Sequence, residues 1–195
     1  MIKSAFRLFA AILVALPLAA AAAARDDGDG SGPATPLGEW RVGPMVTKDG
    51  AFAYCIAESR FDNGRSLTIA RSRRGEINLG LGMPSAHLAK GDAWPVTVRV
   101  DGDYRRERKA VAADPGMLVI GGGSDGRLID ALTHGGTLTI RGPSDTLAFR
   151  LKGTGTAMAE LARCAEQNGG GKPAAPLGSV AASPLQLPPL LKHLL

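Results

Sequence analysis

The side chains best placed to do chemistry in this sequence are its two cysteines, Cys55 and Cys164. Both follow an N-terminal stretch with the pattern of an export signal, and an even number of cysteines in an oxidising compartment generally pairs. We therefore predict one disulfide between an early strand and a late helix. Neither cysteine lies in a Cys-x-x-Cys motif or beside a histidine, so nothing in the pattern favours a nucleophilic pair.

Hydrolysis would need a general base, and two of the three histidines, His87 and His134, precede the C-terminal tail. Ser85 and Asp92 near His87 supply the residue types of a Ser-His-Asp set, but the sequence has no Gly-x-Ser-x-Gly elbow. A small periplasmic hydrolase that uses His87 or His134 is therefore an alternative hypothesis. His134 also fits a favourable charge at the carboxyl end of a helix.

The segment Gly121 to Gly126 matches the G-x-G-x-x-G pattern of dinucleotide-binding loops. Such a loop works inside a parallel βαβ unit, whereas the neighbouring segments here have the pattern of antiparallel hairpins. We therefore interpret it as a turn in which Asp125 caps a short helix, and we expect no cofactor. The dispersed histidines predict no metal site, and Asp101-Gly102-Asp103 fits a hairpin turn better than a calcium loop.

A cluster of cations, Arg105, Arg106, Arg108 and Lys109, is our candidate binding surface. Strand alternation would place Arg106 and Arg108 on one face. Many such runs are merely solvated; the partner we consider is an anionic surface component, such as a lipid head group or an acidic glycan. The net charge of +5 falls by two if Lys3 and Arg7 are removed, and aromatic residues make up 5% of the chain, so we expect no nucleic-acid binding.

These residues are carried by short apolar segments that alternate with turn signals. Three pairs of segments predict hairpins, and two further segments predict single strands. A short helix should start after Asp125 and stop at Gly135, and a second should run from Thr154 or Thr156 to Gln167. The hairpins are expected at 51–57 with 66–71, 94–100 with 104–112, and 137–141 with 146–151, and the single strands at 76–81 and 117–120.

The expected fold is mainly β (α+β), an antiparallel β-sandwich or open barrel of six to eight strands with two short helices near the C-terminal end. Residues 1–24 are interpreted as a signal peptide and 25–36 as a flexible leader. Residues 37–168 should form a single disulfide-linked domain, and 169–195 a disordered tail rich in Ala, Pro and Leu. We expect a periplasmic or secreted product with no stable membrane span after signal cleavage; an uncleaved anchor is the alternative.

The order of these features resembles that of small exported proteobacterial proteins of the invasion-associated locus B type and related uncharacterised periplasmic β-rich domains. The resemblance covers about Leu37 to Cys164. It implies a disulfide-linked β-rich periplasmic domain connected to envelope or host interaction, with no catalytic residues to transfer. It rests on Trp40, Cys55, the segments 98–102 and 149–154, and on Ala157, Leu161 and Cys164.

Together these features favour a non-enzymatic periplasmic or secreted binding module that recognises an envelope protein or an anionic surface component. Besides the hydrolase, a protein inhibitor of an envelope enzyme is an alternative, because small disulfide-linked β domains can present rigid loops. The loop Met83 to Ala93 would then be the inhibitory segment.

Overall fold

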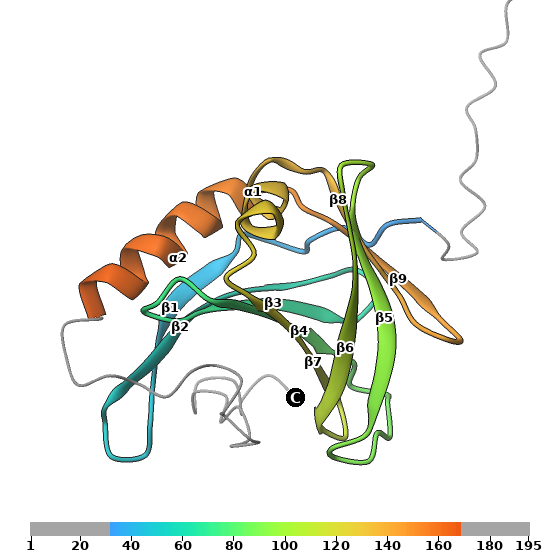
Figure 1. Cartoon of the computed structure of the whole chain (residues 1–195), viewed down its shortest axis with the longest axis horizontal. Helices are drawn as coiled ribbons and strands as arrows, with labels where there is room; N and C mark the ends of the chain where they lie inside the picture. The colour runs from blue at the N-terminus through green and yellow to red at the C-terminus, as the bar shows by residue number, and fades with distance from the viewer. Residues whose placement is uncertain (1–31, 169–195) are drawn as a thin grey trace, which may run out of the picture.

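The computed structural model describes residues 32–168, in which nine strands form one antiparallel sheet that curls into a half-barrel (Figure 1). The order across the sheet is β1-β2-β3-β4-β7-β6-β5-β8-β9, so β4 pairs with β7 and β5 pairs with β8. The strands are β1 (Arg41–Val46), β2 (Phe52–Arg60), β3 (Ser66–Arg71), β4 (Ile77–Gly82), β5 (Ala93–Val100), β6 (Tyr104–Asp114), β7 (Met117–Gly123), β8 (Thr137–Arg141) and β9 (Thr146–Arg150).

The mainly β class, the two helices and the three hairpins β2–β3, β5–β6 and β8–β9 are confirmed. The prediction of six to eight strands is wrong, because the described residues form nine. They make one curled sheet, which agrees with the open-barrel alternative and not with the sandwich. The segment that becomes β1 contains Gly43 and Pro44, which are poor strand formers. It forms a strand at the edge of the sheet, where proline is tolerated.

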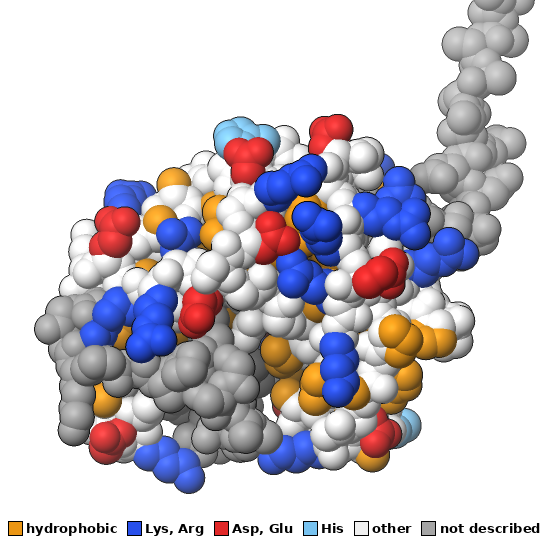
Figure 2. Space-filling model, viewed as in Figure 1, with side chains coloured by type: hydrophobic (Ala, Val, Ile, Leu, Met, Phe, Trp, Pro, Cys, Tyr) orange, Lys and Arg blue, Asp and Glu red, His pale blue; other side chains and the backbone are white. Residues whose placement is uncertain are grey.

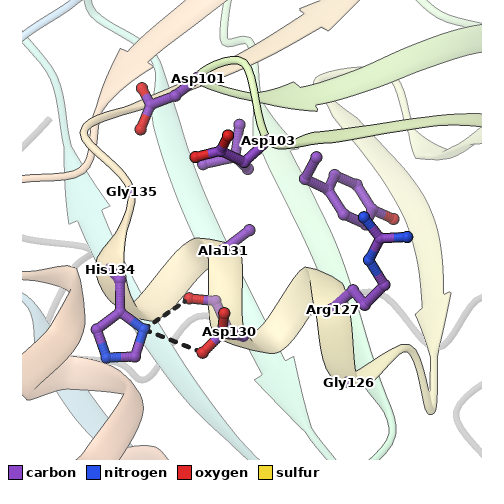
Figure 3. Close-up of a pocket in the computed structure, with 10 residues that line it drawn as sticks. Asp101, Asp103, Gly126, Arg127, Asp130, Ala131, His134 and Gly135 are labelled. Carbon is purple, nitrogen blue, oxygen red and sulfur yellow. Dashed lines mark hydrogen bonds and ion pairs between the residues drawn. The ribbon is translucent and has the colours of Figure 1, made fainter.

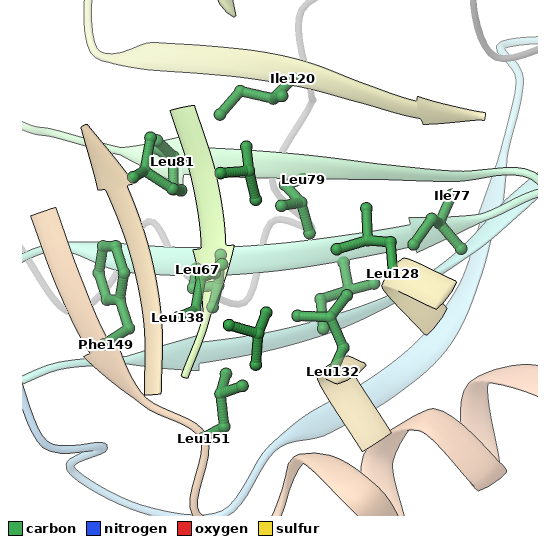
Figure 4. Packing of buried hydrophobic residues seen from close by; sticks show 14 of the residues in the cluster. Leu67, Ile77, Leu79, Leu81, Ile120, Leu128, Leu132, Leu138, Phe149 and Leu151 are labelled. Atoms are coloured by element: carbon green, nitrogen blue, oxygen red, sulfur yellow. The ribbon is translucent and has the colours of Figure 1, made fainter. Parts of the chain in front are cut away.

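Two helices cover one end of the half-barrel: α1 (Gly126–His134) and α2 (Thr154–Asn168). α1 turns Leu128 and Leu132 into the core, and both side chains are fully buried (Figure 4). α2 packs on β1, β2 and α1. The rings of Phe61 and Phe149 meet edge to face with centroids 4.9 Å apart, so the turn after β2 is packed against β9. None of the helices in the described part of the chain has the length and apolar character needed to cross a membrane.

The disulfide between Cys55 and Cys164 is present and joins β2 to α2 across 109 residues of sequence. Cys55 is fully buried in the core, and Cys164 packs against that core from the helix. The predicted linkage between an early strand and the last helix is therefore confirmed. The bond encloses every element from β3 to the body of α2 in one covalent loop.

The folded part begins earlier than the expected Leu37, so the interpretation of residues 25–36 as a flexible leader is wrong for its last residues. Ala34 is buried, and its backbone N–H and C=O bond to Ala148 and Arg150 of β9. Leu37 N donates to the carbonyl of Arg60 at the end of β2. This segment thus bridges the β9 edge and the end of β2. The proposed signal peptide, most of the leader and the tail lie outside the described residues.

Strand β6 leaves β7 halfway along its length, and this separation shapes the surface described next. Its C-terminal half pairs with β7 from Ala110 onward, whereas Tyr104 to Lys109 pair with β5 alone. α1 lies beside this first half of β6. The side chains of Tyr104 to Lys109 therefore face either α1 on the inner side of the sheet or solvent on the outer side.

Candidate functional site

The four cations predicted as one surface, Arg105, Arg106, Arg108 and Lys109, lie on two faces of β6. Arg106 is opposite Val98 and Arg108 is opposite Val96, and both valines are buried. Directly opposed residues point to the same side of a sheet. Arg106 and Arg108 therefore share a face, as predicted, but it is the inner face, and Arg105 and Lys109 point outward.

Arg108 holds α1 against the sheet. Its Nη2 donates to the hydroxyl of Tyr104 at 3.0 Å and forms an ion pair with Asp125 Oδ2, which also accepts the Tyr104 hydroxyl at 2.9 Å. The other carboxylate oxygen of Asp125 accepts the backbone N–H groups of Arg127 and Leu128. The Arg108 side chain is 24% exposed and its Nη2 is committed to these contacts, so we assign Arg108 to holding α1 rather than to a binding surface.

Burial raises the pKa of the Tyr104 phenol above its usual value, so the hydroxyl stays protonated and donates to Asp125. Burial also disfavours the ionised form of Asp125. The hydrogen bond from Tyr104, the backbone N–H groups and the charge of Arg108 outweigh that effect, and the pKa of Asp125 is lowered. The carboxylate is thus ionised at neutral pH and caps the helix.

The outward positions of β6, β5, β8 and β9 carry a second set of cations. Their register places Arg105 opposite Arg99, Arg141 opposite Thr97, and Arg150 opposite Thr137, with alternate residues on the same side. All five cations of this set are exposed. We call it the outer basic face; its members are Arg99, Arg105, Lys109, Arg141 and Arg150.

The charges of this face are poorly balanced. Among the outward-facing residues of 95–99, 105–109, 137–141 and 146–150, Glu107 is the one carboxylate. It accepts the Thr97 hydroxyl at 2.7 Å and lies 3.9 Å from Arg105 Nη2. Arg99 lies directly opposite Arg105, an arrangement of like charges that lowers stability. Figure 2 shows a different group of Lys and Arg side chains (blue), with Asp and Glu (red) among them, beside α1 on the helix side of the sheet.

A hollow of about 490 Å³ lies between the β5–β6 turn and α1 (Figure 3). His134 Nδ1 is 3.1 Å from Asp130 Oδ1 at its rim, and both side chains are about three-quarters exposed. Asp101 lies on the opposite wall, where its carboxylate accepts the backbone N–H groups of Gly136 and Thr137. The hollow therefore combines a histidine–carboxylate pair with a carboxylate that positions the start of β8.

Beside His134 in this hollow, the described residues provide the carboxylate that a hydrolase would need but no hydroxyl nucleophile hydrogen-bonded to the histidine. In residues 32–168, no hydrogen bond joins His134 to a Ser, Thr or Tyr hydroxyl. His87 is exposed on the loop after β4, and within the same range no hydrogen bond connects it to Ser85 or Asp92. A triad would need such contacts.

Comparison with known proteins places the fold. No family model and no curated protein matches the chain. The crystal structure of invasion associated protein B from Bartonella henselae superposes with a TM-score of 0.51 over 70% of this chain and 99% of that one, at 18% identity. The chain shares the fold of invasion associated protein B. At this identity the likeness concerns the fold, and it confirms the resemblance seen in the sequence.

The invasion associated protein B fold of this chain brings together residues that sequence reasoning did not connect. Arg99, Arg141 and Arg150 lie on three strands, and β5 and β8 are neighbours in space although three elements separate them in sequence. A signal was available in the alternation of each strand, since each arginine follows an apolar residue at a strand end. The order of the strands in the sheet, which places these arginines side by side, could not be inferred from the sequence.

Proposed function

We propose that this chain is a non-enzymatic exported binding module that recognises an anionic surface component, in the periplasm or outside the cell, through its outer basic face. The observation that carries the proposal is the set of five exposed cations on four adjacent strands, with Arg99 and Arg105 directly opposed. Opposed like charges reduce stability in the unbound protein. An anion that bridges the two guanidinium groups would relieve the repulsion.

The geometry suits repeated anionic groups. Neighbouring strands lie about 4.8 Å apart, and alternate residues along a strand about 7 Å apart, so the cations form a grid on that scale. Four of the five are arginines, whose planar guanidinium groups bind phosphate or carboxylate oxygens in pairs. Phospholipid head groups and acidic glycans both present such anions in arrays.

The double charge reversal Arg99→Glu with Arg105→Glu is expected to weaken binding to anionic surfaces at least tenfold. Each cation near an anionic membrane contributes about 1 kcal/mol, so changing two of them removes a large share of the attraction. Binding is measured by co-sedimentation with vesicles of phosphatidylcholine containing phosphatidylglycerol, and by calorimetry with an acidic polysaccharide. The vesicle and polysaccharide arms distinguish the two sources of anion.

A matched control reverses two exposed cations in turns of the other half of the sheet, Lys48→Glu and Arg74→Glu. This variant has the same net charge as the first and should retain most of the binding. Equal losses in both variants would mean that net charge, not the outer basic face, drives the attraction. Stronger binding to duplex DNA than to either probe would contradict an anionic surface as the partner.

A further inference from the structure

The half-barrel has an apolar hollow at the end opposite the two helices. The hollow measures about 580 Å³, and each wall strand contributes a residue near this end. The walls and floor are Leu81 of β4, Leu118 of β7, Ala110 of β6, Val96 of β5, Ile140 of β8 and Leu147 of β9. At the other end, the equivalent interior space is filled by Leu128 and Leu132 of α1 (Figure 4).

Apolar side chains remain partly exposed around this hollow. Trp94, Met83, Leu88 and Leu118 line it and are only half-buried. Apolar surface that stays in contact with water forgoes about 25 cal/mol per Å² of stabilisation, so filling the hollow with an apolar group would be favourable. Hollows of about 300 to 1,000 Å³ at the mouth of a β-barrel are a common form of small-ligand site.

The rim of the hollow carries one charged pair, Arg65 and Asp145. Arg65, on the β2–β3 turn, lines it together with the β8–β9 turn. Arg65 Nη2 is 3.6 Å from Asp145 Oδ2, a loose contact in which the arginine side chain is 34% exposed. Arg141 lines the adjoining polar hollow with Arg65, Asn63 and Ser144. Apolar walls thus meet a rim where the Arg65 guanidinium lies near one carboxylate, while Arg141 lines the neighbouring polar hollow rather than this one.

We propose that this hollow binds a single-chain amphiphile with an anionic head, such as a long-chain fatty acid. The hydrocarbon chain occupies the space between Leu81, Val96, Ile140 and Leu147, and the head group exchanges contacts with Arg65 in place of Asp145. Each buried methylene contributes about 0.8 kcal/mol, so a chain of this type binds without specific polar contacts along its length. This site is separate from the outer basic face.

The test uses the two tryptophans of the chain as reporters. Trp94 lines the hollow, whereas Trp40 donates its indole N–H to the Lys152 carbonyl near the start of α2. A fatty acid that carries a nitroxide at mid-chain quenches indole fluorescence on contact. Below its micelle concentration, it should quench the unmodified protein and Trp40→Phe saturably, and Trp94→Phe hardly at all.

Two variants locate the chain and the head group. Leu88→Glu places a charge in the mouth of the hollow and should lower the affinity for the nitroxide-labelled fatty acid at least tenfold. Near-ultraviolet circular dichroism checks that the variant folds. Arg65→Glu leaves the apolar walls intact. It should lower the affinity for the fatty acid tenfold and change the affinity for a fatty alcohol much less. If Leu88→Glu does not fold, Arg65→Glu and the two tryptophan variants still decide the question.

The reversal Arg99→Glu with Arg105→Glu should leave this quenching unchanged, which separates the hollow from the outer basic face. Quenching that does not saturate, or that is as strong in Trp94→Phe as in Trp40→Phe, would overturn the proposal. So would equal affinities of Arg65→Glu and the unmodified protein for the fatty acid.

Discussion

Replacement of Cys55 and Cys164 together by alanine is expected to lower the free energy of unfolding by about 4 kcal/mol. The bond spans 109 residues of sequence. Of the described fold, it encloses seven of the nine strands, all of α1 and most of α2. Closing a loop of that length removes much of the conformational entropy of the unfolded chain. Losing it restores that entropy and favours unfolding.

The measurement is urea-induced unfolding of the oxidised protein, of the reduced protein, and of the double variant. Reduced protein and variant should lose similar stability, because both lose the same covalent constraint. Hydrogen exchange adds a local reading, since α2 packs on β1, β2 and α1 and should lose protection first when the bond to β2 is gone. A double variant within about 1 kcal/mol of the oxidised protein would contradict the prediction.

Features set by a few neighbouring residues were predictable from the sequence. Asn63-Gly64 marks the β2–β3 turn, where Gly64 has φ of 74°. The cap by Asp125 and the stop at Gly135 set the limits of α1 within one residue. The disulfide followed from the even number of cysteines and from the predicted export signal. Each of these inferences needs information from a single segment or from composition, which is why each is confirmed.

Features set by distant segments were not predictable in the same way. Alternation shows that Arg106 and Arg108 share a face, but whether that face is inner or outer depends on the curl of the sheet and on α1. Arg99 meets Thr139 of β8 only because β5 is inserted between β6 and β8. Ala34 looks like part of a polar leader, and it is ordered by β9, more than 100 residues later. Long-range pairing, not local propensity, decides these contacts.

Asp125→Ala is expected to lower the free energy of unfolding by about 3 kcal/mol. The substitution removes one partner of a largely buried ion pair and also the cap of a helix. The Asp125 side chain is 19% exposed and accepts bonds from Arg108, Tyr104 and two backbone N–H groups. Arg108 Nε is already buried without a hydrogen bond among the described residues. Removing the carboxylate would leave most of this guanidinium buried without its counter-charge.

The same carboxylate gives the prediction a pH signature. Its pKa in the folded protein lies below the usual value for an aspartate, so its contribution to stability is complete above the unfolded pKa and is lost as the pH falls through the folded pKa. The stability difference between the unmodified protein and Asp125→Asn should therefore be constant near neutrality and shrink below about pH 4.

Asp130→Ala, an exposed change on the same helix, is the control and should lower the free energy of unfolding by less than about 0.5 kcal/mol. If Asp125→Asn shows the same deficit at pH 3 as at pH 7, the negative charge is not what joins α1 to β6, and the packing of Leu128 and Leu132 must hold the helix in place.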